Sequence, residues 1–227
     1  MIESTNSSVL MKFRDKSNYE LVYRIEEDIQ DAQDAALKDI KDFANSVVIS
    51  KASVFPESSS FLSGVTNVVP KLQSHGLSVY VETFSNEFVS QAWDFFSDST
   101  VEINSYVMGV NISGVITEFP LTSARYKRNR CLGYNVLPLY MSPAQPGGLM
   151  PLIPPFALPP AEPPNPVLTA PDVEEGPLPS HTASPPVPGG GATAVPPGLQ
   201  MDCPRLVRAS SCPFGYAHHH SSAALKL

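Results

Sequence analysis

Proline is distributed very unevenly along this chain of 227 residues, and this distribution limits what the chain can fold into. Of its 24 prolines, 19 lie between Pro138 and Pro197. Proline has no amide hydrogen to donate and its φ angle is fixed, so this stretch cannot form helices or interior strands. We therefore predict a folded part over residues 1–133, a proline-rich disordered linker or stalk over 134–199, and an atypical disordered C-terminus over 200–227.

The folded part alternates between two kinds of apolar pattern. Short apolar runs predict strands at 1–5, 20–25, 46–50, 77–84 and 114–119, and helical spacing predicts helices at 27–44, 66–74, 87–96 and 99–108. Strands that alternate with helices are typical of βαβ units and a parallel sheet. The strands are continuous apolar runs, which indicates that both faces of this sheet are covered.

Charge and hydropathy exclude several classes of protein. Residues 1–133 contain 12 Lys and Arg against 17 Asp and Glu, whereas a nucleic-acid-binding domain is usually basic. We expect no nucleic-acid partner, although the run from Arg125 to Arg130 is locally basic. We also expect no membrane span and no signal peptide, because no apolar run reaches 18 residues and the N-terminus lacks a basic and an apolar region. Asn6 and Asn111 begin glycosylation sequons.

Candidate site residues lie where the predicted strands end. In a sheet of parallel strands, residues at the carboxyl ends face the ligand crevice. Glu82 and Thr83 end one strand and Glu118 follows the last one, while Glu3 and Ser4 end the first. A carboxylate pair of Glu82 and Glu118 would assist a metal or repel a phosphate. The alternative is that these carboxylates bond to loop amides or to the basic run, at Arg125 or Arg128.

Longer motifs carry a resemblance to a known family. The strand GVITEFP, the strand VYVETF and the run RYKRNRCLG are similar to plant glycerophosphodiester phosphodiesterase-like proteins of the GPI-anchored, two-domain type. Further matching segments include TNSSVL, YELVYRIEEDI, VVISKASVFP, TNVV, NEFVSQ, DFFSDSTVEINSY and ALPPAEPP. The resemblance extends from Ile2 to about Pro166.

The resemblance implies a fold, a reaction and a location. The fold is a TIM barrel, of which this chain would be strands four to eight in the C-terminal part of the second domain. The reaction is hydrolysis of a glycerophosphodiester to glycerol 3-phosphate and an alcohol, within lipid and glycerol metabolism. A histidine pair would supply acid/base chemistry, and acidic residues would hold a divalent metal, Ca²⁺ or Mg²⁺. The location is the extracellular face of the plasma membrane or the cell wall.

The sequence departs from the family pattern at functional positions. Residues 1–133 contain one histidine, His75, so they cannot supply a catalytic histidine pair. The resemblance implies that this pair and the metal ligands belong to the early strands, which this chain lacks, so we expect no activity from this chain alone. Glu82 stands where the family has a tryptophan, and Glu118 where it often has an aspartate. We expect no GPI tail after the proline-rich part, because the last residues resemble a different reading frame or an alternative exon. The alternatives are a non-catalytic cell-surface protein that binds wall polymers, and a truncated gene-model fragment.

Overall fold

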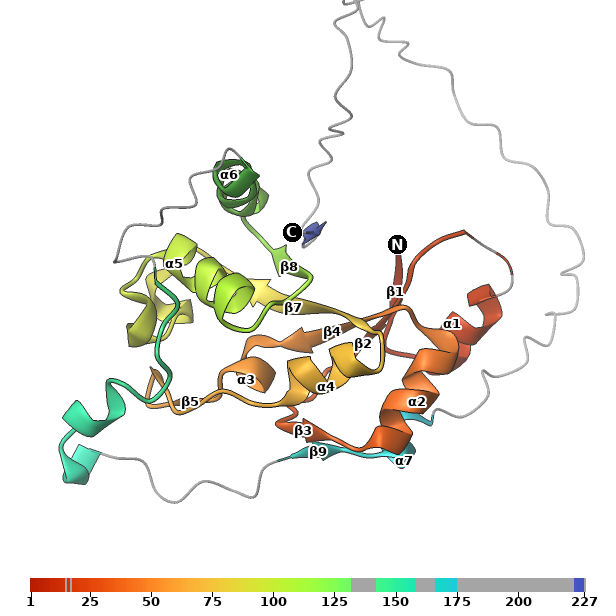
Figure 1. Cartoon of the computed structure of the whole chain (residues 1–227), viewed down its shortest axis with the longest axis horizontal. Helices are drawn as coiled ribbons and strands as arrows, with labels where there is room; N and C mark the ends of the chain where they lie inside the picture. Colours follow the sequence, from red (N-terminus) through yellow and green to blue (C-terminus); the bar gives the residue numbers. More distant parts are fainter. Residues whose placement is uncertain (15, 17, 132–141, 158–165, 175–222, 227) are drawn as a thin grey trace, which may run out of the picture. The chain divides into compact units, whose positions relative to one another are not determined.

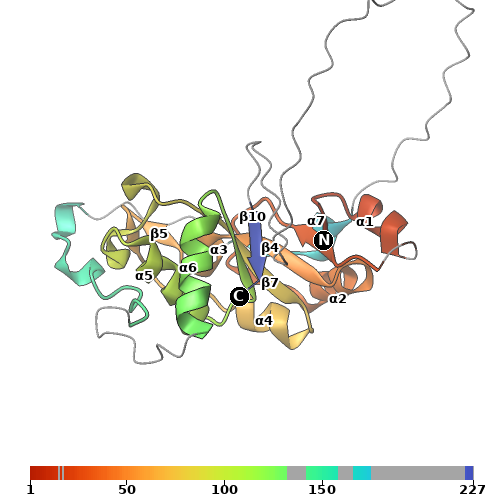
Figure 2. The ribbon, with the colours of Figure 1, turned by 90° about the horizontal axis from the view of Figure 1, so that it is seen from above.

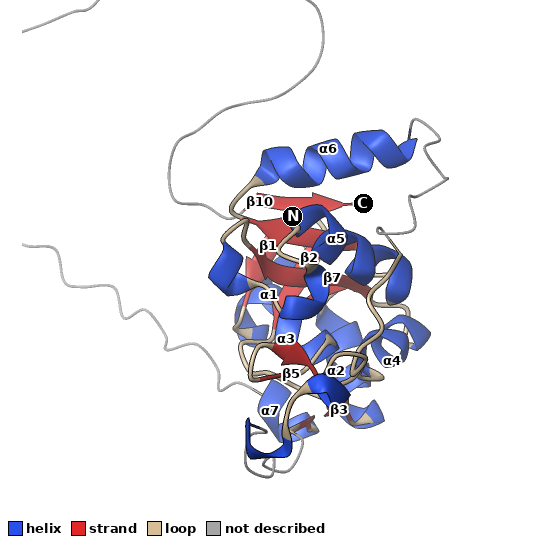
Figure 3. Cartoon of the chain, turned by 90° about the vertical axis from the view of Figure 1, so that its left-hand side faces the viewer, coloured by secondary structure: helices blue, strands red, loops and turns tan. Residues whose placement is uncertain are grey.

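A curled sheet of five parallel strands forms the centre of the protein. The computed structural model describes residues 1–14, 16, 18–131, 142–157, 166–174 and 223–226. The parallel strands lie side by side in the order of the chain (Figure 1): β1 (Ile2–Ser4), β2 (Leu21–Arg24), β4 (Ser46–Ser50), β7 (Ser78–Phe84) and β8 (Gly114–Thr117). Figure 3 shows the strands in red with the helices around them in blue. The predicted partial barrel is therefore confirmed.

The two faces of the sheet bury different apolar clusters. The inner face carries four buried side chains, one from each of the strands β2, β4, β7 and β8: Val22, Val48, Tyr80 and Ile116. The outer face packs against the helices, and alternate residues of the same strands join that larger core. This alternation follows from the period of two in a β-strand. It fixes which strand-end side chains face inward.

Helices follow most of the strands and cover the outer face (Figure 1). Their bounds are α1 (Ser7–Arg14), α2 (Asp34–Phe43), α3 (Lys51–Val54), α4 (Val68–Ser74), α5 (Ser99–Asn104) with its continuation η3 (Ser105–Gly109), and α6 (Pro120–Cys131). The hairpin β5 (Glu57–Ser58) and β6 (Phe61–Leu62) lies between α3 and α4. None of the described helices is long and apolar enough to cross a membrane.

The predicted helix over 27–44 is wrong in its first part. Only Asp34–Phe43 is helical, and before it lies strand β3 (Asp31–Ala32), which pairs in parallel with β9 (Val167–Leu168). The amide of Gln33 donates to the carbonyl oxygen of Leu168 at 2.8 Å. Because these backbone groups bond to a distant segment, they do not start the helix.

Two other segments also differ from prediction. The single helix expected over 87–96 is two short 3₁₀ turns, η1 (Phe88–Ser90) and η2 (Trp93–Phe95). The basic run, for which no helix was predicted, lies in the twelve-residue helix α6. Its apolar positions show no helical periodicity, because α6 contacts the rest of the protein mainly through Tyr126 and Ser123.

Parts of the proline-rich region pack on the barrel. Helix α7 (Ala170–Val173) lies against α2 (Figure 1), and Leu168 and Val173 are buried. Two 3₁₀ turns, η5 (Met150–Leu152) and η6 (Pro155–Ala157), precede them, and β10 (Ala223–Lys226) pairs antiparallel with β8. The expectation that the proline-rich stretch forms no helix is therefore wrong at α7, where Pro171 lies in the first turn and needs no amide hydrogen. Most of the predicted disordered tail lies outside the described residues, and the domain boundary at residue 133 stays a prediction.

Candidate functional site

A charged cluster lies at the carboxyl ends of three strands. Arg24 ends β2 and lies between Glu3 of β1 and Glu82 of β7. Its Nε is 2.7 Å from Glu82 Oε1, and its Nη1 is 3.8 Å from Glu3 Oε1. The shorter contact is an ion pair whose angle is not that of a hydrogen bond, since the Nε–H group has no hydrogen-bond partner among the described residues. One cation therefore serves two carboxylates.

Glu82 is the most buried member of this cluster. Its side chain is 11% exposed, against 41% for Arg24. Burial raises the pKa of the Glu82 carboxyl, and the negative charges of Glu3 and Glu26 act in the same direction, while Arg24 opposes them. A carboxyl with a raised pKa at the carboxyl end of a barrel strand is a candidate for binding or proton transfer.

The other predicted site residues lie near Glu82 in the chain but do not join its ion pairs. Thr83 is half-buried, and the peptide bond between Glu82 and Thr83 is cis. Glu118 is exposed, and its amide donates to the carbonyl oxygen of Phe84 at 3.2 Å. Within the described residues, the side chains of Glu118, Arg125 and Arg128 have no ion-pair partner. The pairing of Glu82 with the basic run, which the sequence left open, is replaced by its pairing with Arg24.

The described residues do not fit a divalent metal. They contain no group of three or more His, Cys, Asp or Glu side chains placed to hold an ion. The two carboxylates at the strand ends share the Arg24 guanidinium, whose charge would repel a metal cation. His75 lies elsewhere, directly after α4, with Nδ1 3.1 Å from the carbonyl oxygen of Lys71. We therefore derive no chemistry through a metal.

A second ion pair is more deeply buried. Lys51, which directly follows β4, places Nζ 2.9 Å from Glu102 Oε1 and donates to the carbonyl oxygen of Ser90 at 2.7 Å. Glu102 is 1% exposed, and its Oε2 has no partner among the described residues. Burial raises the pKa of Glu102 to about 7, although the nearby Lys51 charge lowers it. The cost of desolvation thus outweighs the attraction within the pair.

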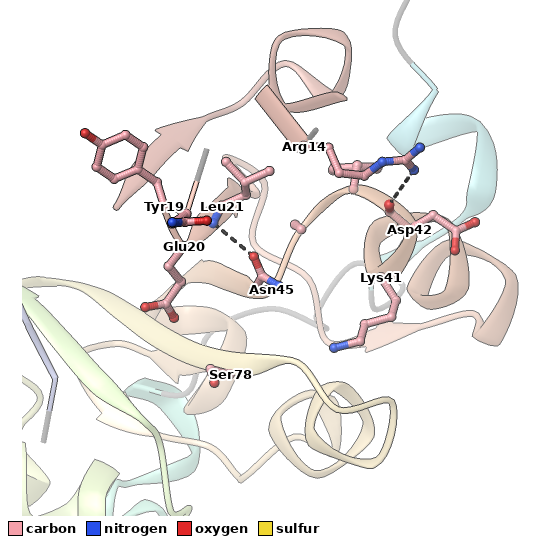
Figure 4. Close-up of a pocket in the computed structure, with 11 residues that line it drawn as sticks. Arg14, Tyr19, Glu20, Leu21, Lys41, Asp42, Asn45 and Ser78 are labelled. Carbon is pink, nitrogen blue, oxygen red and sulfur yellow. Dashed lines mark hydrogen bonds between the residues drawn. The ribbon is translucent and has the colours of Figure 1, made fainter. Parts of the chain in front are cut away.

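A polar pocket of about 550 Å³ lies at the opposite, amino end of the strands. Figure 4 shows Asn45 accepting from the amide of Leu21 at 3.1 Å, and Arg14 donating to the carbonyl oxygen of Asp42 at 2.9 Å. Ligand sites of barrel proteins lie at the carboxyl end, and residues at the amino end serve stability. We assign this pocket to the support of the strand starts.

The two sequons lie in different surroundings. Asn6 precedes α1 and uses its Oδ1 to accept from the amide of Val9 at 3.1 Å, which caps the helix. Asn111 is exposed in a turn just before β8, with a left-handed φ of 61°. Its side chain is the more accessible of the two.

Fold and site together define a class of protein: part of a parallel β/α barrel whose charged residues gather at the carboxyl ends of its strands. The chain is 59% identical to Glycerophosphodiester phosphodiesterase GDPDL3 of Arabidopsis thaliana over 195 residues. These residues make up 86% of the chain and 26% of that protein. It is 61% identical to Glycerophosphodiester phosphodiesterase GDPDL1 of the same plant over 178 residues. These residues make up 78% of the chain and 23% of the relative.

A third relative has a different name. Protein SUPPRESSOR OF NPR1-1 CONSTITUTIVE 4 of Arabidopsis thaliana is 57% identical over 187 residues, which cover 82% of the chain and 17% of that protein. These identities confirm the resemblance to glycerophosphodiester phosphodiesterase-like proteins. The chain spans about a quarter of the length of GDPDL3 and GDPDL1. No protein-family model matches the chain.

Sequence reasoning missed three of the charged residues. Arg24 lies inside the predicted strand over 20–25, so the rule that selected Glu82 could also have found it. Lys51 directly follows a predicted strand and carried the same signal. Glu102 gave no such signal, because it belongs to a helix and only the packing of α5 brings it to Lys51.

Proposed function

We propose that this chain supplies the substrate-facing late strands of a glycerophosphodiester phosphodiesterase-like barrel, without the residues that perform the hydrolysis. The Glu3–Arg24–Glu82 cluster supports this proposal, because it lies at the barrel's ligand end. The expected location, at the extracellular face of the plasma membrane or the cell wall, belongs to the same proposal.

The proposed role of Arg24 is to attract the phosphodiester group. A guanidinium offers several donors in one plane and suits phosphate oxygens. In the free protein this charge is shared by Glu3 and Glu82. Protonation of Glu82, favoured by its raised pKa, would leave Arg24 more available to an anion. Neither step supplies the general acid and base that cleavage of the diester requires.

The first expected result is that purified residues 1–227 do not hydrolyse glycerophosphocholine. Loss of a general acid or base alone typically lowers the rate by about two to four orders of magnitude. Release of glycerol 3-phosphate is measured with Ca²⁺, with Mg²⁺ and with a chelator, beside a complete glycerophosphodiester phosphodiesterase as the positive control. Metal-dependent turnover by the purified chain, after a second purification step, would refute the proposal.

A second candidate function is the non-catalytic binding of a cell-wall polysaccharide. Trp93 and Phe96, in the segment after β7, are 49% and 72% exposed. Phe96 is held by a hydrogen bond from its amide to the carbonyl oxygen of Trp93 at 3.0 Å, with a left-handed φ of 53°. Exposed aromatic surface often marks a binding site, and flat rings suit the apolar faces of sugars.

For this second function we expect wild type to be retarded in native gels that contain soluble pectin or xyloglucan. Phe96→Ala should reduce that retardation, because it removes the more exposed of the two rings. Val89→Ala is the matched control, since Val89 is 91% exposed in the same segment and is not aromatic. Equal migration of all three proteins with and without polysaccharide would reject this function.

A further inference from the structure

Helix α6 concentrates positive charge in a protein whose net charge is −7. Arg125, Lys127, Arg128 and Arg130 all lie in this helix, which contains no acidic residue. Arg125 is exposed, and it has neither an ion pair nor a hydrogen bond to any described residue. An arginine without a carboxylate partner is open to an external anion.

Arg125 lines a pocket between two helices. The pocket has a volume of about 320 Å³ and lies where α5 and α6 run side by side (Figure 2). The described residues that line it are polar and include no carboxylate: Ser99, Thr100, Thr122, Arg125, Tyr126 and Asn129. Thr122, Arg125 and Asn129 are three and four residues apart, so one face of α6 presents them together.

Neighbouring bonds leave the donors of the pocket available. Thr122 Oγ1 accepts from Asn86 Nδ2 at 2.9 Å, so its own hydroxyl hydrogen remains to be donated. Asp98, which lies next to the pocket, is occupied at the start of α5, where its Oδ1 accepts from the amides of Thr100 and Val101 at 2.8 and 3.4 Å. The pocket therefore acts through its side chains rather than through the amides of α5.

This donor set matches a phosphate group better than a carboxylate. Arg125 offers a planar fork of N–H donors, and hydroxyl and amide donors surround it from both helices. A carboxylate has two oxygens, whereas a phosphate has up to four and can use donors from several directions.

We propose that the pocket between α5 and α6 binds a phosphate group, with Arg125 as its principal ligand. The site lies among the outer helices and is separate from the Glu3–Arg24–Glu82 cluster, so it does not depend on the proposed function. Its ligand is inorganic phosphate or the phosphate of a small phosphomonoester. Both present the same tetrahedral anion to the same donors.

The test is a titration of full-length ¹⁵N-labelled protein, followed by amide chemical shifts at constant ionic strength. We expect saturable shifts at Ser99, Thr100, Thr122 and Asn129 with inorganic phosphate, and none with acetate. A parallel titration with glycerol 3-phosphate separates the two sources, since tighter binding of this ester identifies a phosphomonoester. Arg125→Ala should weaken phosphate binding at least tenfold. Loss of a hydrogen bond to a charged group costs at least about 1.5 kcal/mol, which corresponds to roughly a tenfold change in the dissociation constant.

Arg128→Ala is the matched control, because Arg128 is exposed on the same helix but does not line the pocket. It should change the dissociation constant by less than about twofold. Circular dichroism checks that both variants retain wild-type structure. Equal weakening by both variants would show a diffuse charge effect and overturn the proposal, as would the absence of saturable shifts in wild type.

Discussion

Replacing Glu102 with glutamine should stabilise the protein relative to wild type by an amount that grows as the pH rises. The pKa of Glu102 is raised by burial from 4.5 to about 7 in the folded protein. The folded state thus binds a proton at Glu102 more tightly than the unfolded state does. The stability that wild type gains from this proton is complete below pH 4.5 and is lost as the pH rises toward 7. Glutamine is neutral at every pH, so the stability of the variant does not fall in this way.

The unfolding free energy of Glu102→Gln minus that of wild type should increase by about 3 kcal/mol from pH 4.5 to pH 7.5, at about 1.4 kcal/mol per pKa unit. Urea denaturation followed by circular dichroism at several pH values measures it. Because wild type and Glu102→Gln are compared at each pH, the titration of groups that do not interact with Glu102 cancels. A difference that stays constant across this range would show that Glu102 remains ionised beside Lys51.

Removing the ring of Tyr106 should be the most destabilising single truncation that we consider. Tyr106 is fully buried, and its ring centroid lies 4.7 Å from that of Phe55 and 5.0 Å from that of Phe84. Both contacts are edge-to-face, the arrangement that aromatic pairs prefer. Tyr106→Ala leaves a cavity among these rings and should lower the unfolding free energy by about 3–5 kcal/mol.

Two controls separate the ring from other effects. Tyr106→Phe keeps the ring and loses only the hydroxyl, which donates to the carbonyl oxygen of Lys51 at 3.3 Å, so it should cost about 1 kcal/mol. Phe96→Ala removes a ring that is 72% exposed and should change stability by less than about 0.5 kcal/mol. A Tyr106→Ala variant as stable as Phe96→Ala would contradict the assigned core.

The sheet was predictable because β2, β4, β7 and β8 are mostly buried and are therefore largely continuous apolar runs. All five strands lie within two residues of their expected bounds, because Val22, Val48 and their neighbours form apolar runs without polar residues at alternate positions. The start of α2 was not predictable, because residues 31–32 pair with Val167–Leu168, more than 130 residues away. Local propensity contains no information about that partner.

The candidate site was predictable in position but not in its partners. The rule that strand carboxyl ends face the ligand located Glu3 and Glu82, and both lie in the charged cluster. Whether Glu82 would pair with Arg24 or with the basic run depended on the curl of the sheet and on the placement of α6. Neither can be predicted from the residues around Glu82 in the sequence.

By itself, the sequence determined the parallel β/α architecture and the resemblance to glycerophosphodiester phosphodiesterase-like proteins, because apolar periodicity and long motifs are local properties of the chain. Only the tertiary structure decided which charges meet. It placed Arg24 between two carboxylates, buried Glu102 against Lys51 and left Arg125, beside a polar pocket, without a partner among the described residues. Electrostatic interactions depend on distance and burial in space, and both are set by packing between elements far apart in the chain.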